Sequence, residues 1–186
     1  MLKSSISFIF DVLKKKMKII AFAGSNSSKS INHKLVSYAV KLVENSEVIK
    51  LNDYVVPMYS QDLENSEGIP QSIKHLDAKL SESNKLVISV CEYNGNISAF
   101  FKNILEWLSR NNRDFLKNKQ VVILSASPGG GGAQTALAIT ERTLPYFGAE
   151  VVSKVSVKGF NDIFKDGKIV DQELNNQLLK AINSFR

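Results

Sequence analysis

A serine-rich segment offers the first group of side chains that could do chemistry. Residues 24–32 read Gly-Ser-Asn-Ser-Ser-Lys-Ser-Ile-Asn and directly follow an apolar run. We expect Ser25, Ser27, Ser30 and Asn32 to donate hydrogen bonds, while the predicted next helix adds free backbone N–H groups and the positive end of its dipole. Such donors suit a phosphate group. An ordinary serine-capped helix is the open alternative, because serine and asparagine are common N-caps.

A second polar loop follows the apolar run at residues 86–90 and contains Glu92, Tyr93, Asn94 and Gly95. Asn94 and Gly95 favour a turn, since both tolerate positive φ. The main-chain donors and acceptors of this loop, with Tyr93 as an aromatic wall, would suit the edge of a planar heterocycle. A purely structural turn is the alternative.

A third loop begins with Ser127, Pro128 and Gly129 and continues as glycine to residue 132. Glycine lets the backbone approach a ligand closely, although a flexible connection is equally compatible with a glycine run. The first loop lacks the glycines of a Walker motif, because Ala23 and Ser28 stand at those positions, and no G-x-G-x-x-G motif is present. A Walker or dinucleotide-binding loop is therefore not expected.

The elements that must position these loops alternate regularly along the chain. Apolar β-branched runs predict strands, and apolar residues at helical spacing predict the helices between them. The strands are expected at 19–23, 47–51, 86–90, 120–125 and 151–157, and the helices at 31–43, 69–83, 97–108, 133–147 and 174–185. This alternation predicts an α/β domain: a doubly wound, five-stranded parallel sheet with helices on both faces. The three loops would then meet at the carboxyl edge of the sheet.

Composition narrows the class of protein. The chain has 186 residues, 44% of them hydrophobic, and a net charge of +6. The lysines are scattered, so we expect no nucleic-acid surface, and no run is apolar enough to span a membrane. Cys91 is the only cysteine, which fits a reducing, cytoplasmic location. We expect residues 1–16 to be an N-terminal extension and residues 17–186 to form the domain.

Three segments carry a family resemblance: GSNSSKSIN from Gly24, EYNGNISAFFKNILEWLSR from Glu92, and SPGGGG from Ser127. The chain resembles the NADPH-dependent FMN reductase family of flavodoxin-like proteins, which includes quinone, azo-dye and chromate reductases. The similarity runs from about Met17 almost to Arg186. Family members usually carry Arg where this chain has Ser27.

The resemblance implies a flavodoxin-like fold and an FMN cofactor. Ser25, Ser27, Ser30 and Asn32 would hold the FMN phosphate. The ribityl chain and ring would be lined by Glu92, Tyr93, Asn94 and Gly95, and Ser127, Pro128 and Gly129 would close over the ring region. NAD(P)H would be the co-substrate, with electrons passing through FMN to a small acceptor such as a quinone, an azo compound or free flavin. A homodimer or homotetramer is also implied.

Two other classes of function remain open from the sequence. One is a flavodoxin-like electron carrier that takes no hydride, although such carriers tend to be acidic and this chain is basic. The other is a flavin-free interaction protein that has kept only the fold. Because a cofactor would supply the chemistry, we expect no catalytic acid–base pair. We also expect no metal site, because His33 and His75 have no nearby ligand partner and Phe164 removes an oxygen from the one segment that partly resembles a calcium loop.

Overall fold

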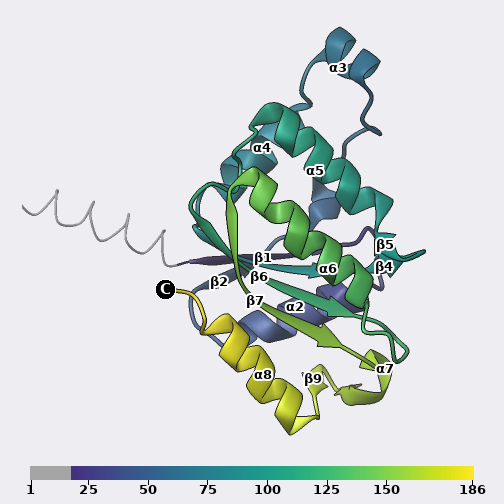
Figure 1. Cartoon of the computed structure of the whole chain (residues 1–186), viewed down its shortest axis with the longest axis vertical. Helices are drawn as coiled ribbons and strands as arrows, with labels where there is room; N and C mark the ends of the chain where they lie inside the picture. The colour runs from purple at the N-terminus through teal and green to yellow at the C-terminus, as the bar shows by residue number, and fades with distance from the viewer. Residues whose placement is uncertain (1–17) are drawn as a thin grey trace, which may run out of the picture.

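The computed structural model describes residues 18–186. The predicted extension at residues 1–16 and the predicted domain start at Met17 lie outside the described residues. Within the described part, the chain folds around one parallel sheet with helices on both faces (Figure 1).

The central sheet has five parallel strands in the order β2-β1-β3-β6-β7. Their bounds are β1 Ile19–Gly24, β2 Ser46–Val48, β3 Lys85–Val90, β6 Lys119–Ala126 and β7 Ala149–Val157. The order confirms the predicted flavodoxin-like fold. After β1 the chain passes to β2 on one side and then returns to β3 on the other side. This reversal creates a crevice at the carboxyl ends of β1 and β3, where open α/β sheets bind ligands.

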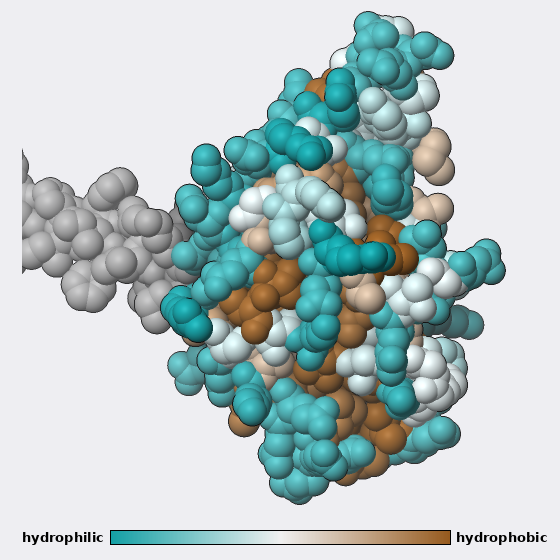
Figure 2. Space-filling model, in the orientation of Figure 1, coloured by the Kyte–Doolittle hydropathy of each residue, from teal (hydrophilic) through white to brown (hydrophobic). Residues whose placement is uncertain are grey.

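Two helical layers cover the sheet. On one face lie α2 (Ile31–Lys41) and α8 (Gln172–Ile182), and on the other lie α4 (Gln71–Leu80), α5 (Ala99–Asn111) and α6 (Gln134–Thr143). Each helix buries an apolar stripe against the strands, which are apolar on both sides, as expected for a sheet covered on both faces. Figure 2 shows hydrophilic side chains over the helices and apolar atoms in the hollows between them. Among the described residues, no helix is long and apolar enough to cross a membrane.

Several predicted elements differ in detail from the observed ones. The second strand was predicted at 47–51 but β2 covers only Ser46–Val48, because the chain turns into a short 3-10 helix, η1 (Leu51–Asp53). The predicted polar connection at 53–68 contains a further helix, α3 (Gln61–Glu67), which has no buried residue and projects from the body of the domain (Figure 1). Ser60 caps this helix by accepting a hydrogen bond from the N–H of Leu63.

The end of the predicted fourth helix and the two small hairpins follow from turn residues. The helix predicted at 133–147 is α6 followed by the 3-10 helix η2 (Leu144–Phe147), which contains Pro145 and stops at Gly148 with φ 92°. The loop after β3 is a hairpin of β4 (Glu92–Tyr93) and β5 (Asn96–Ile97). After β7 come the short helix α7 (Phe160–Ile163) and the hairpin of β8 (Phe164–Lys165) and β9 (Lys168–Ile169).

Candidate functional site

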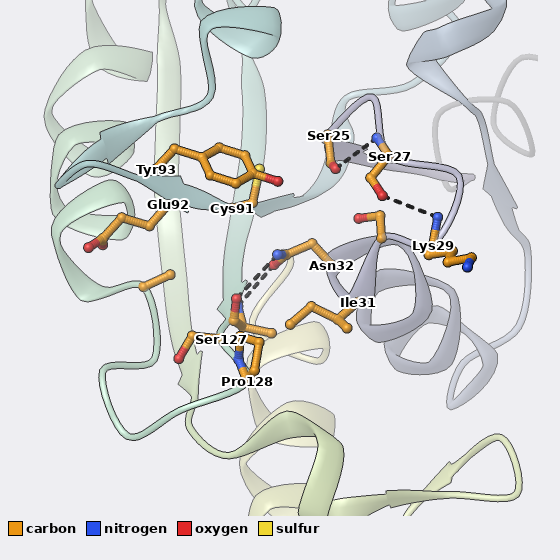
Figure 3. A pocket seen from close by; sticks show the side chains of 13 residues that line it. Ser25, Ser27, Lys29, Ile31, Asn32, Cys91, Glu92, Tyr93, Ser127 and Pro128 are labelled. Carbon is orange, nitrogen blue, oxygen red and sulfur yellow. Dashed lines mark hydrogen bonds between the residues drawn. The ribbon is translucent and has the colours of Figure 1, made fainter.

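A cavity of about 230 Å³ lies at the carboxyl ends of β1, β3 and β6. It is bounded by the serine loop after β1, the β4–β5 hairpin after β3 and the start of the glycine loop after β6, which converge as predicted (Figure 3). Its lining comprises Ser25, Ser27, Lys29, Ser30, Ile31, Asn32, Cys91, Glu92, Tyr93, Ala126, Ser127, Pro128 and Ala133.

The serine loop presents hydroxyl groups whose own protons are free. Ser25 Oγ accepts a hydrogen bond from the N–H of Ser27 at 3.3 Å, and Ser27 Oγ accepts one from the N–H of Lys29 at 3.2 Å. Ser30 caps α2 by accepting from the N–H of His33 at 3.1 Å. None of these three hydroxyls donates to an acceptor among residues 18–186. A hydroxyl that accepts but does not donate still has its donor available for a ligand oxygen.

The first turn of α2 adds backbone donors to the same end of the cavity. The N–H groups of Ile31 and Asn32 are the first two of the helix, and neither has a protein acceptor in the described part of the chain. Ser25 and Ser30 are each only 9% exposed, so both residues are largely shielded from bulk solvent. This end of the cavity is therefore built to receive oxygen atoms carrying negative charge.

Asn32 joins the serine loop to the other strands. Its side-chain nitrogen donates to the carbonyl of Ala126 at 3.2 Å, and its side-chain oxygen accepts from the N–H of Ala126 at 2.9 Å. The same oxygen accepts from the Ser89 hydroxyl at 2.8 Å. Asn32 is 1% exposed, so its amide holds the start of α2 against the ends of β3 and β6. The structure thus gives this predicted ligand residue a bracing role at the wall of the cavity.

The β4–β5 hairpin forms a second wall. Tyr93 is 56% exposed and its ring borders the cavity (Figure 3). Glu92 turns its carboxylate away from the serines, and its Oε2 accepts from the N–H of Ala136 at 3.0 Å. Because α6 begins without a side-chain cap of its own, this carboxylate caps the helix and anchors the hairpin to it.

Asn94 and Gly95 lie at the tip of that hairpin and do not line the cavity. Their φ angles are 52° and 70°, so the pair forms the left-handed turn that the sequence predicts. Asn94 and Gly95 would therefore contact a ligand only where the ligand extends beyond the cavity lining, or after a movement of the hairpin.

The end of β1 is packed too closely for a larger residue. A Cβ at Gly24 would lie 2.6 Å from Cγ of Phe101, which belongs to α5. The carbonyl of Gly24 accepts from the Ser98 hydroxyl at 2.7 Å and from the Cys91 thiol at 3.3 Å. These contacts fix the first residues after β1 and β3 relative to each other.

The glycine loop is ordered by serines. Ser127 Oγ donates to the carbonyl of Gly129 at 2.8 Å and accepts from the N–H of Gly132 at 2.7 Å. The carbonyl of Gly132 accepts from the hydroxyls of Ser125 and Ser156, at 2.6 and 2.8 Å. Gly129 does not border the cavity, whereas Ser127 and Pro128 do. These hydrogen bonds thus give the loop a defined conformation in which Ser127 and Pro128 form a wall of the cavity.

The structure brings together most of the predicted site residues. Ser25, Ser27, Ser30, Asn32, Glu92, Tyr93, Ser127 and Pro128 line the cavity, and Asn94, Gly95 and Gly129 lie outside its lining. The sequence-based prediction did not include Lys29, Ile31, Cys91, Ala126 and Ala133, which also line it. Lys29 and Ile31 stand within the predicted phosphate loop and could have been included on that ground, whereas the two alanines carry no signal by residue type.

Charge in this region is sparse. Lys29 is the only cationic residue and Glu92 the only acidic residue among those that line the cavity. A neighbouring cavity of about 350 Å³ lies across the serine loop and is bordered by His33, Lys50 and Asp53. Burial and the nearby charge of Lys50 lower the pKa of His33, which favours its neutral form. In the described residues, no group of three or more His, Cys, Asp or Glu side chains could hold a metal ion.

Comparisons with known proteins identify the family of this chain. Residues 17–162 match the model of the family described as NADPH-dependent FMN reductase. A quinone reductase of Escherichia coli (strain K12) is 26% identical over 179 residues, covering 93% of this chain and 95% of that protein. An uncharacterized protein of Mycoplasma pneumoniae is 34% identical over 145 residues, covering 75% of this chain and 86% of that protein.

Solved structures agree on the fold. FerB, a flavoenzyme NAD(P)H:(acceptor) oxidoreductase from Paracoccus denitrificans, superposes with a TM-score of 0.73 at 24% identity, over 90% of this chain and 93% of that one. An FMN-dependent NADH-azoreductase from Bacillus anthracis, solved in complex with FMN, has a TM-score of 0.58 at 15% identity, over 89% and 98% of the two chains. With the family model matching most of its length, this chain belongs to the NADPH-dependent FMN reductase family of oxidoreductases.

Proposed function

We propose that this chain binds FMN in the cavity at the ends of β1, β3 and β6 and uses NAD(P)H to reduce a small acceptor. The acceptor would be a quinone, an azo compound or free flavin. Bound FMN supplies the redox chemistry, and the protein supplies binding, orientation and electrostatics.

One observation carries the placement of the cofactor: the cavity has two chemically different ends. At one end, three serine hydroxyls and two helix N–H groups are free to donate, as a phosphate requires. The rest of the lining includes the Tyr93 and Pro128 rings, which suit a flat aromatic ligand, while Glu92 and Ser127 use polar atoms in hydrogen bonds within the protein. FMN has the same two ends.

The residues divide the work of holding such a ligand. Ser25, Ser27 and Ser30 would donate to the phosphate, and the buried Asn32 would keep the start of α2 in place beneath it. Glu92 would hold the hairpin against α6, so that Tyr93 stays beside the ring. Ser127 would shape the glycine loop so that Pro128 faces the cavity.

Three predicted residues would act through the backbone. Asn94, Gly95 and Gly129 lie just outside the cavity lining, on the two loops that flank its ring end. We propose that the main-chain N–H and C=O groups of these loops meet the polar edge of the flavin ring. Fixed N–H donors at that edge would favour negative charge on the reduced ring.

The open side of the cavity suits a second planar molecule. Tyr93 is more than half exposed, so the region beside it is reachable from solvent. The nicotinamide of NAD(P)H and then the acceptor would enter there in turn. We propose residues 17–186 as the FMN-binding domain, a homodimer or homotetramer as the assembly, and the cytoplasm as the location.

Reconstitution tests the proposal. The purified full chain is mixed with FMN, and NADH or NADPH oxidation is followed at 340 nm with a quinone, an azo dye or excess FMN as acceptor. The proposal expects acceptor-dependent oxidation that requires FMN. Flavin binding without NAD(P)H oxidation would instead favour an electron carrier, and no flavin binding would favour an interaction protein.

A further inference from the structure

Ala133 has a backbone conformation that alanine rarely adopts. Its φ and ψ are 54° and 42°, in the left-handed region, where the Cβ atom lies too close to the carbonyl oxygen that follows. Within residues 18–186, every other non-glycine residue with positive φ is Asn or Asp, whose short polar side chains tolerate this region. Alanine has no such polar group, so the backbone at Ala133 is strained.

Ala133 is also an unfavourable residue for the start of a helix. It is the N-cap of α6, and its side chain makes no capping hydrogen bond. Asn, Asp, Ser and Gly are preferred at N-caps, whereas alanine is strongly disfavoured. Gly132, directly before it, has φ 65° and is a glycine, as this conformation favours. Backbone conformation and capping therefore both favour glycine or asparagine at the position where this chain has Ala133.

Hydrogen bonds on both sides hold Ala133 in this conformation. The carbonyl of Gly132 accepts from the hydroxyls of Ser125 and Ser156, at 2.6 and 2.8 Å. The carbonyl of Ala133 itself accepts from the N–H of Leu137 at 3.1 Å. A strained residue persists only where its surroundings fix it, and such residues cluster at ligand sites. The strain at Ala133 therefore calls for a function of its one side-chain group, the methyl.

Ala133 borders the cavity at the carboxyl ends of β1, β3 and β6, on the same loop as Ser127 and Pro128. It is 4% exposed, so its methyl group is shielded from bulk solvent. Glycine at this position would relieve the strain but would leave the cavity wall without that methyl group. An apolar group at the wall of a cavity contacts whatever fills the cavity.

We propose that the methyl group of Ala133 packs against the flavin ring and fixes its position in the cavity. This inference rests on the proposed function, because it concerns the same cavity. Contact with one buried methyl group corresponds to about fourfold in affinity. The chain thus keeps a less stable backbone at Ala133 in return for a ligand contact, which is a common compromise at functional sites.

Two substitutions and one control, made in the full chain, test this contact. Ala133→Gly removes the methyl group, and Ala133→Asn replaces it with a larger side chain; both new residue types suit a left-handed N-cap. Asn118→Gly is the matched control. Asn118 also has a left-handed backbone, with φ 61°, but it is exposed and precedes β6, at the opposite end of that strand from the cavity.

Tm is measured without flavin, and the dissociation constant and visible spectrum of bound FMN are measured by titration. Ala133→Gly should have a Tm no lower than that of the unmodified chain, because the relief of strain offsets the lost methyl group. It should bind FMN about fourfold more weakly, with a shifted spectrum of the bound flavin. Ala133→Asn should bind FMN more than about tenfold more weakly, because its side chain occupies the place of the ring. Asn118→Gly should match the unmodified chain in affinity and spectrum.

An unchanged dissociation constant for Ala133→Gly overturns the proposed contact. A Tm lowered by more than about 3 °C in that variant also overturns it, because the methyl group would then be needed by the fold itself. These results differ from a failure of the proposed function, in which the unmodified chain itself does not bind FMN.

Discussion

Replacing Asn32 with alanine should loosen the cavity where the start of α2 contacts the end of β6. The Asn32 amide makes three hydrogen bonds, two to the backbone of Ala126 and one to the Ser89 hydroxyl. Ser89 is fully buried and Asn32 nearly so. The alanine variant would leave all three partner groups without this amide in a place that water reaches poorly.

The expected loss follows from those bonds. A typical intramolecular hydrogen bond contributes about 1 kcal/mol net, and a buried group left without a partner costs about 1–3 kcal/mol. Three bonds lost, with partial compensation by an entering water molecule, give a decrease of about 2–4 kcal/mol in the free energy of unfolding. For a domain of this size, such a decrease lowers Tm by roughly 5–15 °C.

Urea unfolding followed by the fluorescence of Trp107 measures the effect, because Trp107 is the only tryptophan and is fully buried. FMN affinity is measured on the same samples under native conditions. Asn175→Ala is the matched control: this amide of α8 accepts from the Tyr38 hydroxyl and donates to the carbonyl of Ile169, far from the cavity. The control should lose stability but keep FMN affinity.

The Asn32 variant should lose both stability and affinity. If the free energy of unfolding of Asn32→Ala lies within about 1 kcal/mol of that of the unmodified chain, the loss expected from its buried hydrogen bonds is wrong. If the variant is destabilised but binds FMN normally, the hydrogen bonds of Asn32 do not determine the shape of the FMN cavity.

Three further predictions test other parts of the structure. Gly132→Ala should weaken FMN binding and lower Tm, because a Cβ there would overlap a serine hydroxyl of β7 and the residue has φ 65°; an unchanged Tm would contradict this. Asn94→Pro should reduce FMN affinity in a folded protein, checked by circular dichroism, because proline cannot adopt the observed φ of 52° and the hairpin would distort. Hydrogen bonds from Lys18 and Lys79 lower the pKa of Glu47, so this carboxylate stabilises the fold at pH values above its ordinary pKa, and that stabilisation is lost as the pH falls through the lowered pKa. Glu47→Gln should therefore flatten the acid side of the curve of Tm against pH. A curve parallel to that of the unmodified chain would refute this role of Glu47.

The sequence predicted those parts of the fold that depend on local chemistry. Alternating apolar runs identified the five strands and their helices, because each run must bury itself against a neighbour. The turn at Asn94 and Gly95 was predictable because these residue types tolerate positive φ, and both have it in the structure. The convergence of the three loops followed from the parallel sheet, whose carboxyl ends share one edge.

Contacts between distant residues could not be predicted in this way. Asn32 and Ala126 are 94 positions apart, and Glu92 and Ala136 are 44 apart. Nothing in the spacing of these residues indicates that the amide braces two strands or that the carboxylate caps a distant helix. The early end of β2 and the exposed helix α3 were not predicted, because they are set by capping and chain direction and not by an apolar period.

A crystal structure of the full chain with FMN tests the central claim most directly. The account predicts the phosphate within hydrogen-bonding distance of the hydroxyls of Ser25, Ser27 and Ser30, and the ring between Tyr93 and Pro128. FMN bound elsewhere, or bound with its phosphate pointing away from the serine loop, would contradict it.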